Sequence, residues 1–85
     1  MNDATYPTIL KSVTELCVEV LRVPLDKVCP SARLIEDLDV DSLFVIQLAM
    51  ALEEKFNVEV PEDDMPRFKT VDDIVLYLQP KLEAA

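Results

Sequence analysis

The sequence predicts an all-α fold: a small four-helix bundle of three longer helices and one short helix, with a long packed loop between the first two. Apolar residues recur at spacings of three and four along three segments, as on the buried face of a helix. Prolines stand between or near the ends of these segments, where helices begin or stop. The 85 residues suffice for one domain, so we assign residues 1–85 to a single domain.

The first helix is predicted to begin near Pro7, because proline is favoured in a first helical turn. It should fade before Pro24, since the residue that precedes a proline disfavours helical geometry. Its buried face is formed by Ile9, Leu10, Val13, Leu16, Cys17, Val20 and Leu21.

Residues 22–40 form the long loop, which contains Pro24 and Pro30 and has room for one short turn of helix. A connection of this length is usually packed or functional, and this one is rich in apolar residues. We therefore expect it to pack on the core through Val23, Leu25, Val28, Leu34, Ile35 and Leu38.

The second helix is predicted over residues 42–56. Its inner face consists of Val45, Leu48, Ala49, Leu52 and Phe56. A second apolar stripe, rotated away from the first, consists of Leu43, Ile46 and Met50. Asn57 suits a left-handed helix end. Residues 58–60 follow as an extended connector, or as an edge strand for which no partner strand is evident.

A short third helix is expected from Glu62 to Met65, and Pro66 should keep it brief. The last helix has a clear start, because Thr70 and Asp73 form a capping box with Asp in place of Glu. Pro80 should end it. Its inner face consists of Val71, Ile74, Val75 and Leu78.

Composition excludes several classes of function. With 17 acidic and 8 basic residues the net charge is −9, which repels phosphate backbones and makes a basic protein surface the natural partner. The chain has no His, so Ser-His-Asp, Cys-His and His-based zinc sites cannot form. It has no Gly, which removes every Gly-rich phosphate loop. We expect a protein that binds or carries something, not an enzyme.

No signal peptide and no transmembrane segment are evident, so we expect a cytoplasmic monomer without membrane contact. Cys17 and Cys29 could pair in an oxidising compartment. Cys17 lies on an apolar helical stripe, which favours a buried free thiol, and the state of Cys29 is open.

The tripeptide Asp41-Ser42-Leu43 stands where the long loop meets the second helix. Ser is a preferred helix cap, so this position has an ordinary structural explanation. Its surroundings indicate more. Residues 38–43 read LDVDSL, residues 49–56 read AMALEEKF, residues 58–61 read VEVP, and residues 69–71 read KTV. In this order and spacing the chain resembles an acyl carrier protein over about residues 8–79.

The resemblance implies a four-helix carrier fold in which Ser42 is the attachment point of 4'-phosphopantetheine. A phosphopantetheinyl transferase would transfer this arm from coenzyme A with magnesium, and its thiol would carry acyl thioesters between enzymes of fatty-acid or polyketide biosynthesis. A phosphodiester on Ser42 would lie at a helix amino terminus, which favours an anion by roughly 0.3–1 kcal/mol.

The resemblance also implies a docking surface for enzymes such as ketosynthases and acyltransferases with basic patches. Its candidates are Asp41, Leu43, Phe44, Ile46, Gln47, Met50, Glu53 and Glu54. All except Gln47 have a plainer alternative: Asp41 favours a helix start, the two Glu residues can be a solvated face, and the apolar residues can be core. In the same way, the most direct interpretation of the inner residues is core, and the resemblance makes them candidates for an acyl-chain cavity: Val45, Leu48, Ala49, Leu52, Phe56, Val60, Phe68 and Val71.

Three positions depart from the family pattern. Asp39 stands where Gly is common, which predicts a stiffer and more acidic loop. Phe44 replaces a common acid and Gln47 a common Glu, so the helix loses negative charge and gains apolar area unless Phe44 folds inward. We infer partners different from those of a housekeeping fatty-acid carrier, and hence a discrete carrier of a polyketide or specialised lipid pathway.

Three rival interpretations remain. Asp37, Asp39 and Asp41 match the opening of an EF-hand loop, but Ser42 and Leu48 occupy its required Gly and Glu positions. An unmodified acidic helical adaptor would explain the charge and the bundle, but not the residues around Ser42. A peptidyl carrier typically has Gly and His before its Ser, and this chain has neither.

Overall fold

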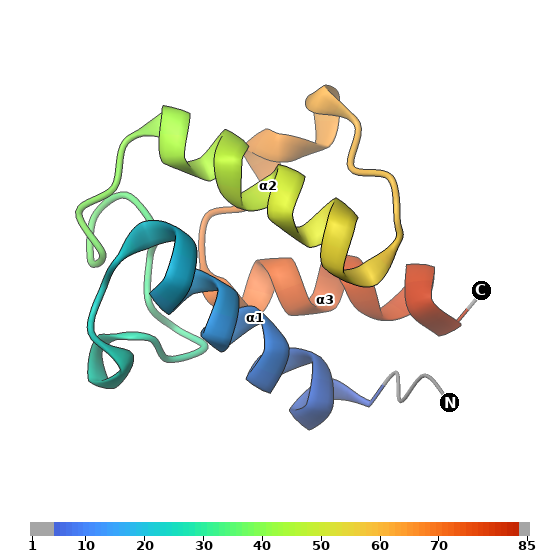
Figure 1. Cartoon of the computed structure of the whole chain (residues 1–85), viewed down its shortest axis with the longest axis horizontal. Coiled ribbons are helices and arrows are strands. Elements are labelled where there is room, and N and C mark those ends of the chain that lie inside the picture. Colours follow the sequence, from blue (N-terminus) through green and yellow to red (C-terminus); the bar gives the residue numbers. More distant parts are fainter. Residues whose placement is uncertain (1–4, 84–85) are drawn as a thin grey trace.

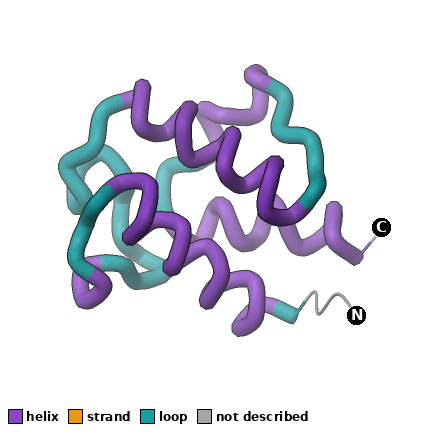
Figure 2. Tube along the Cα trace, in the orientation of Figure 1, coloured by secondary structure: helices purple, strands orange, loops and turns teal. Residues whose placement is uncertain are grey.

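The computed structural model describes residues 5–83, which form an all-helical structure (Figure 1). In chain order its elements are α1 (Tyr6–Leu21), the 3-10 turn η1 (Leu25–Lys27), α2 (Ser42–Phe56), the 3-10 helix η2 (Glu62–Arg67) and α3 (Val71–Glu83). No strand occurs in the described residues, where residues 58–60 are a loop connector (Figure 2). The predicted all-α fold is confirmed, and α2 has the predicted bounds.

The core lies where α1 packs against both α2 and α3. Each long helix contributes side chains from which solvent is fully excluded, and no polar side chain of residues 5–83 is buried with them. Truncating a buried Leu or Ile to Ala typically costs about 2–5 kcal/mol, so such side chains hold the bundle together. They include Val13 and Cys17 of α1, Leu48 and Leu52 of α2, and Ile74 and Leu78 of α3.

The long loop packs on the core, as predicted, through Val28, Leu34 and Leu38. Leu25 and Ile35 do not share this role, because their side chains are exposed. Backbone hydrogen bonds tie the loop to the start of α3: the Leu34 N–H donates to the carbonyl of Lys69 at 2.9 Å, and the Val71 N–H donates to the carbonyl of Ala32 at 3.1 Å. The loop therefore leads into α2 from a fixed position.

Two predicted helix ends are confirmed. Asn57 closes α2 in the left-handed region, with φ of 55°. At the start of α3 the Asp73 N–H donates to Thr70 Oγ1 at 3.1 Å, while the Thr70 N–H donates to Asp73 Oδ2 at 3.0 Å. This reciprocal pair is the predicted capping box.

The predicted stop at Pro80 is wrong, and the short third helix is brief, as predicted, but extends two residues beyond Met65. α3 continues through Pro80 to Glu83, and η2 continues through Pro66 to Arg67. Pro80 lacks an N–H, which removes the hydrogen bond to the carbonyl of Leu76. Leu76 is exposed, so water can satisfy that carbonyl, and the buried Leu82 anchors the last turn. In η2 the short 3-10 geometry has few bonds for Pro66 to break.

Candidate functional site

Asp41, not Ser42, caps α2. The Asp41 carboxylate accepts a hydrogen bond from the Phe44 N–H at 3.1 Å, and the backbone of Asp41 is extended. Ser42 is the first helical residue. The explanation of Ser42 as an ordinary helix cap is therefore wrong, because its neighbour fills that role.

The Ser42 side chain is exposed and makes no hydrogen bond with any part of residues 5–83. The N–H groups of Ser42 and Leu43 also lack a partner in this described part of the chain. Free N–H groups at the start of a 15-residue helix favour an anion, so a phosphate on Ser42 would find donors beside it.

The residue at the family's frequent Gly position has a special backbone conformation. Asp39 lies in the left-handed region with φ of 56°, which is uncommon for residues other than Gly, Asn and Asp. The next residue, Val40, is buried, and its N–H donates to the carbonyl of Leu34 at 3.4 Å. Sequence reasoning noted the charge of Asp39 but missed its positive φ, which the family's Gly at this position could have signalled.

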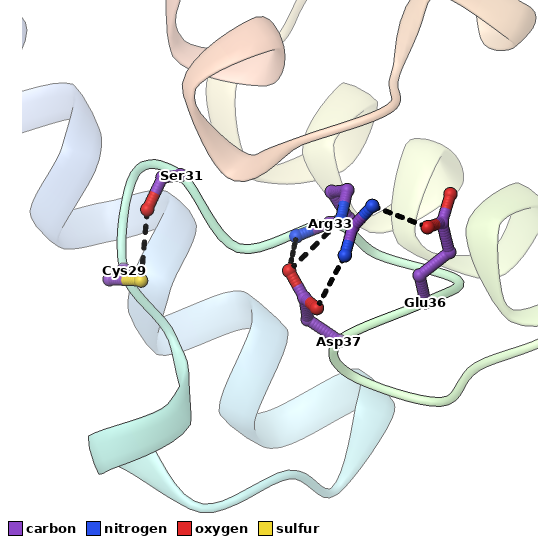
Figure 3. A network of polar contacts seen from close by, with 5 residues as sticks. All are labelled: Cys29, Ser31, Arg33, Glu36 and Asp37. Atoms are coloured by element: carbon purple, nitrogen blue, oxygen red, sulfur yellow. Dashed lines mark hydrogen bonds and ion pairs between the residues drawn. The ribbon is translucent and has the colours of Figure 1, made fainter.

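Acidic residues of the loop are held by Arg33 (Figure 3). The Arg33 N–H donates to Asp37 Oδ2 at 2.8 Å, its guanidinium contacts both Asp37 oxygens, and it also pairs with Glu36. These hydrogen bonds, above all the one from the Arg33 backbone, lower the pKa of Asp37. Among residues 5–83 no group of three metal-ligating side chains converges, so the Asp37, Asp39 and Asp41 sequence forms no assembled cation site.

Both cysteines are free thiols. Cys17 is buried in the core, as predicted, and burial raises its pKa to about 11. Cys29 is exposed in the loop and lies 3.6 Å from the Ser31 hydroxyl (Figure 3).

The exposed face of α2 is apolar around Ser42. Leu43 and Met50 are 60% and 61% exposed, and Phe44 and Ile46 are each 39% exposed. Phe44 therefore points outward, not into the core. No charged residue occurs in residues 42–52, where the exposed polar residues are Ser42 and Gln47.

The two Glu residues near the end of α2 differ. Glu54 is exposed, whereas Glu53 is half-buried and accepts a hydrogen bond from the Val60 N–H at 3.0 Å. Glu53 therefore holds the connector that follows α2, and its carboxylate is only partly available to a partner.

A pocket of about 790 Å³ opens beside Ser42, between α2, η2 and the start of α3. Two of the predicted cavity residues, Val45 and Phe68, line it. The other predicted residues do not line it: Leu48, Ala49, Leu52, Val60 and Val71 are buried in the core, and Phe56 is half-buried. Sequence reasoning missed the wall formed by η2, including Met65 and Pro66, because a six-residue helix has no readable periodicity.

Comparison with known proteins identifies the family. Residues 11–78 match the family described as "Phosphopantetheine attachment site". The chain belongs to this family.

Its relatives are acyl carrier proteins. The acyl carrier protein of Helicobacter hepaticus is 48% identical over 69 residues, which cover 81% of this chain and 91% of the relative. That of Bdellovibrio bacteriovorus is 44% identical over 72 residues, covering 85% and 92% of the two chains. The meromycolate extension acyl carrier protein of Mycolicibacterium smegmatis is 36% identical over 80 residues, covering 94% of this chain and 80% of the relative.

The protein is thus a carrier of acyl groups, not a catalyst, and its cofactor is covalent 4'-phosphopantetheine, whose thiol holds acyl groups as thioesters. Carriers of this family work with a phosphopantetheinyl transferase and acyl-processing enzymes. The residues fit the cofactor: at the start of α2, Ser42 lines the pocket, and its hydroxyl and the first two backbone N–H groups have no partner within residues 5–83. None of the helices in residues 5–83 is long and apolar enough to cross a membrane.

Proposed function

We propose that Ser42 is the attachment residue of 4'-phosphopantetheine and that the chain is a single carrier domain of a dedicated polyketide or specialised lipid pathway. The exposed Ser42 hydroxyl, released from capping by Asp41, is the observation that carries the attachment proposal. Ser42 acts here as the substrate of a transferase and therefore needs no activating base in its own chain. The proposal places the protein in the cytoplasm as a monomer, in contact with neither membrane nor nucleic acid.

The outer face of α2 is the proposed docking surface. It consists of Asp41, Leu43, Phe44, Ile46, Gln47, Met50 and Glu54, with Glu53 at its inner edge. Acids stand only at its two ends, so we expect cations of a ketosynthase or acyltransferase to meet those ends and an apolar surface to meet Phe44 and Met50.

The pocket beside Ser42 is the proposed shelter for the acyl chain. Its volume of about 790 Å³ lies within the usual range for ligand pockets. Val45 and Phe68, both buried, form part of its lining.

Incubation with coenzyme A, magnesium and an active broad-specificity transferase, followed by intact mass measurement, tests the attachment. We expect a gain of one phosphopantetheine in the wild type and in Ser31→Ala, which removes another exposed hydroxyl, and no gain in Ser42→Ala. A wild-type chain that stays unmodified would overturn the proposal in favour of an unmodified adaptor.

Turnover by a housekeeping fatty-acid ketosynthase tests the pathway. We expect weak turnover of the acylated wild type and about a tenfold increase for the double variant Phe44→Asp, Gln47→Glu, which restores acids to α2. The matched control Leu25→Asp, Ser31→Glu adds the same charge to the exposed loop and should change nothing. Full turnover of the wild type would contradict a separate set of partners.

A further inference from the structure

Tyr77 of α3 stands at the centre of a cluster that reaches η2. Its hydroxyl donates to Asp64 Oδ2 at 2.6 Å, and its ring meets the Phe68 ring edge to face with centroids 5.0 Å apart. The Arg67 guanidinium carbon lies 5.5 Å and the Lys81 ammonium 5.0 Å from the Tyr77 ring centroid. Cations over an aromatic face and a phenol on a carboxylate are both attractive, so these contacts act together.

Apart from this cluster, η2 contacts α2 and packs on the core through the partly buried Met65. None of its six residues is buried, and Asp64 and Met65 are only half-buried. Its backbone bonds are local, such as Asp64 N–H to the Pro61 carbonyl at 2.9 Å and Phe68 N–H to the Met65 carbonyl at 3.0 Å. The position of η2 therefore depends strongly on the Tyr77 cluster.

The same segment forms a wall of the pocket beside Ser42. Met65, Pro66 and Phe68 line that pocket, whereas Tyr77 lies against Phe68 without lining it. A smaller hollow of about 210 Å³ is lined by Arg67, Leu76 and Tyr77, and Asp73 lines both spaces. Tyr77 and Phe68 thus stand between a pocket and additional space.

We propose that Tyr77 is a latch on the pocket wall and sets the length of acyl chain that the protein shelters. This inference rests on the proposed attachment at Ser42. While the Tyr77 hydroxyl is bonded to Asp64, Phe68 is held in place, and the sheltered acyl chain must end at the Phe68 ring. Releasing that bond lets η2 and Phe68 move, which gives a longer linear chain access to the smaller hollow.

Loading the protein from acyl-coenzyme A donors whose linear acyl groups increase in length tests this latch. Hydroxylamine cleavage of each thioester reports shelter, because a sheltered thioester reacts more slowly. In the wild type we expect protection to rise with chain length and then fall. Tyr77→Phe keeps the ring but loses the Asp64 bond, so the longest chains should become about tenfold better protected, on the scale of one charge-assisted hydrogen bond.

Two variants complete the design. Tyr6→Phe removes a comparable hydrogen bond, from Tyr6 to Asp72, at a place away from the pocket, and should keep the wild-type length profile. Asp64→Asn keeps an acceptor for Tyr77 and should give an intermediate shift; it also carries the test if Tyr77→Phe unfolds by circular dichroism.

The outcomes separate this inference from the proposed function. Failure to load Ser42, seen by mass, overturns the attachment itself. Normal loading with the same length profile in the wild type and Tyr77→Phe overturns the latch alone. Cleavage that is independent of chain length in the wild type also overturns the latch, since the pocket then shelters no cargo.

Discussion

The helices α2 and α3 begin in opposite ways. At α3 the N–H groups of Val71, Asp72 and Asp73 are all bonded, to the carbonyls of Ala32 and Pro30 and to the Thr70 hydroxyl. Of the first three N–H groups of α2 only that of Phe44 is bonded, to Asp41, and the two N–H groups before it have no partner in residues 5–83. A fully bonded start stabilises the fold, whereas a partly bonded start leaves room for a ligand.

Removing the Asp73 half of the α3 capping box should have the largest effect on stability. Asp73→Ala loses the bond from the Thr70 N–H and its side of the capping box, so we expect the free energy of unfolding to fall by about 1–2 kcal/mol. Urea unfolding measures it, with Asp63→Ala as a control that removes an exposed acid of η2. Loading of Ser42 should persist. An equal fall in the free energy of unfolding in Asp73→Ala and Asp63→Ala would contradict a stabilising role of the capping box.

Removing the α2 cap should cost less and should also change the site. Asp41→Ala should lower the free energy of unfolding by about 1 kcal/mol, because one capping bond is lost. Asp41→Asn keeps a capping oxygen and removes only the charge. If Asp41 also meets the transferase, both variants should load more slowly but only the Ala variant should lose stability. Normal loading of Asp41→Asn would limit Asp41 to capping.

Alkaline pH should lower the free energy of unfolding through Tyr77 of α3. Burial, followed by the hydrogen bond to Asp64, raises the pKa of Tyr77 to about 12 from 10.0. The neutral phenol is thus the stabilising form: its contribution is complete below pH 10 and is lost as pH rises through about 12.

We expect a loss on the order of 1 kcal/mol from this titration, after allowance for partial exposure. The pKa of Tyr6 is also raised, chiefly by its hydrogen bond to Asp72, so the experiment uses Tyr6→Phe as background. Urea unfolding from pH 9 to 12 should then show a slope that becomes smaller in the double variant with Tyr77→Phe, in which the buried Cys17 thiol, with its pKa raised to about 11, still contributes. An equal slope in the double variant would assign the whole loss to other groups.

The smallest effect concerns the approach to α2. Asp39→Gly replaces a residue held at φ of 56° by one that adopts this region without strain, and should raise the free energy of unfolding by up to about 1 kcal/mol. Thermal unfolding measures the gain. Asp39→Ala keeps a side chain and removes the same charge, so it should destabilise; a gain in both variants would indicate charge relief instead of backbone strain.

Local patterns predicted most of the helical framework. Periodicity predicted both ends of α2, and the Thr70 and Asp73 spacing predicted the start of α3, because these signals depend on neighbours along the chain. Asp41 and Ser42 are both good caps, so the sequence alone could not assign that role. The Tyr77 and Asp64 contact spans 13 residues without a periodic signal, and the end of α3 beyond Pro80 depends on tertiary packing of Leu82.

The uncharged surface of residues 42–52 has a kinetic consequence. A carrier must leave each enzyme after delivering its cargo, so its residence time on a partner limits flux. If partners dock on this surface as proposed, the acids at its ends speed the first encounter, and that rate falls with ionic strength. The apolar centre around Phe44 and Met50 would then act mainly after contact, on dissociation, which salt hardly changes. Ionic strength would thus adjust how often this protein meets its enzymes, and the packing of a few apolar side chains would decide how long each visit lasts.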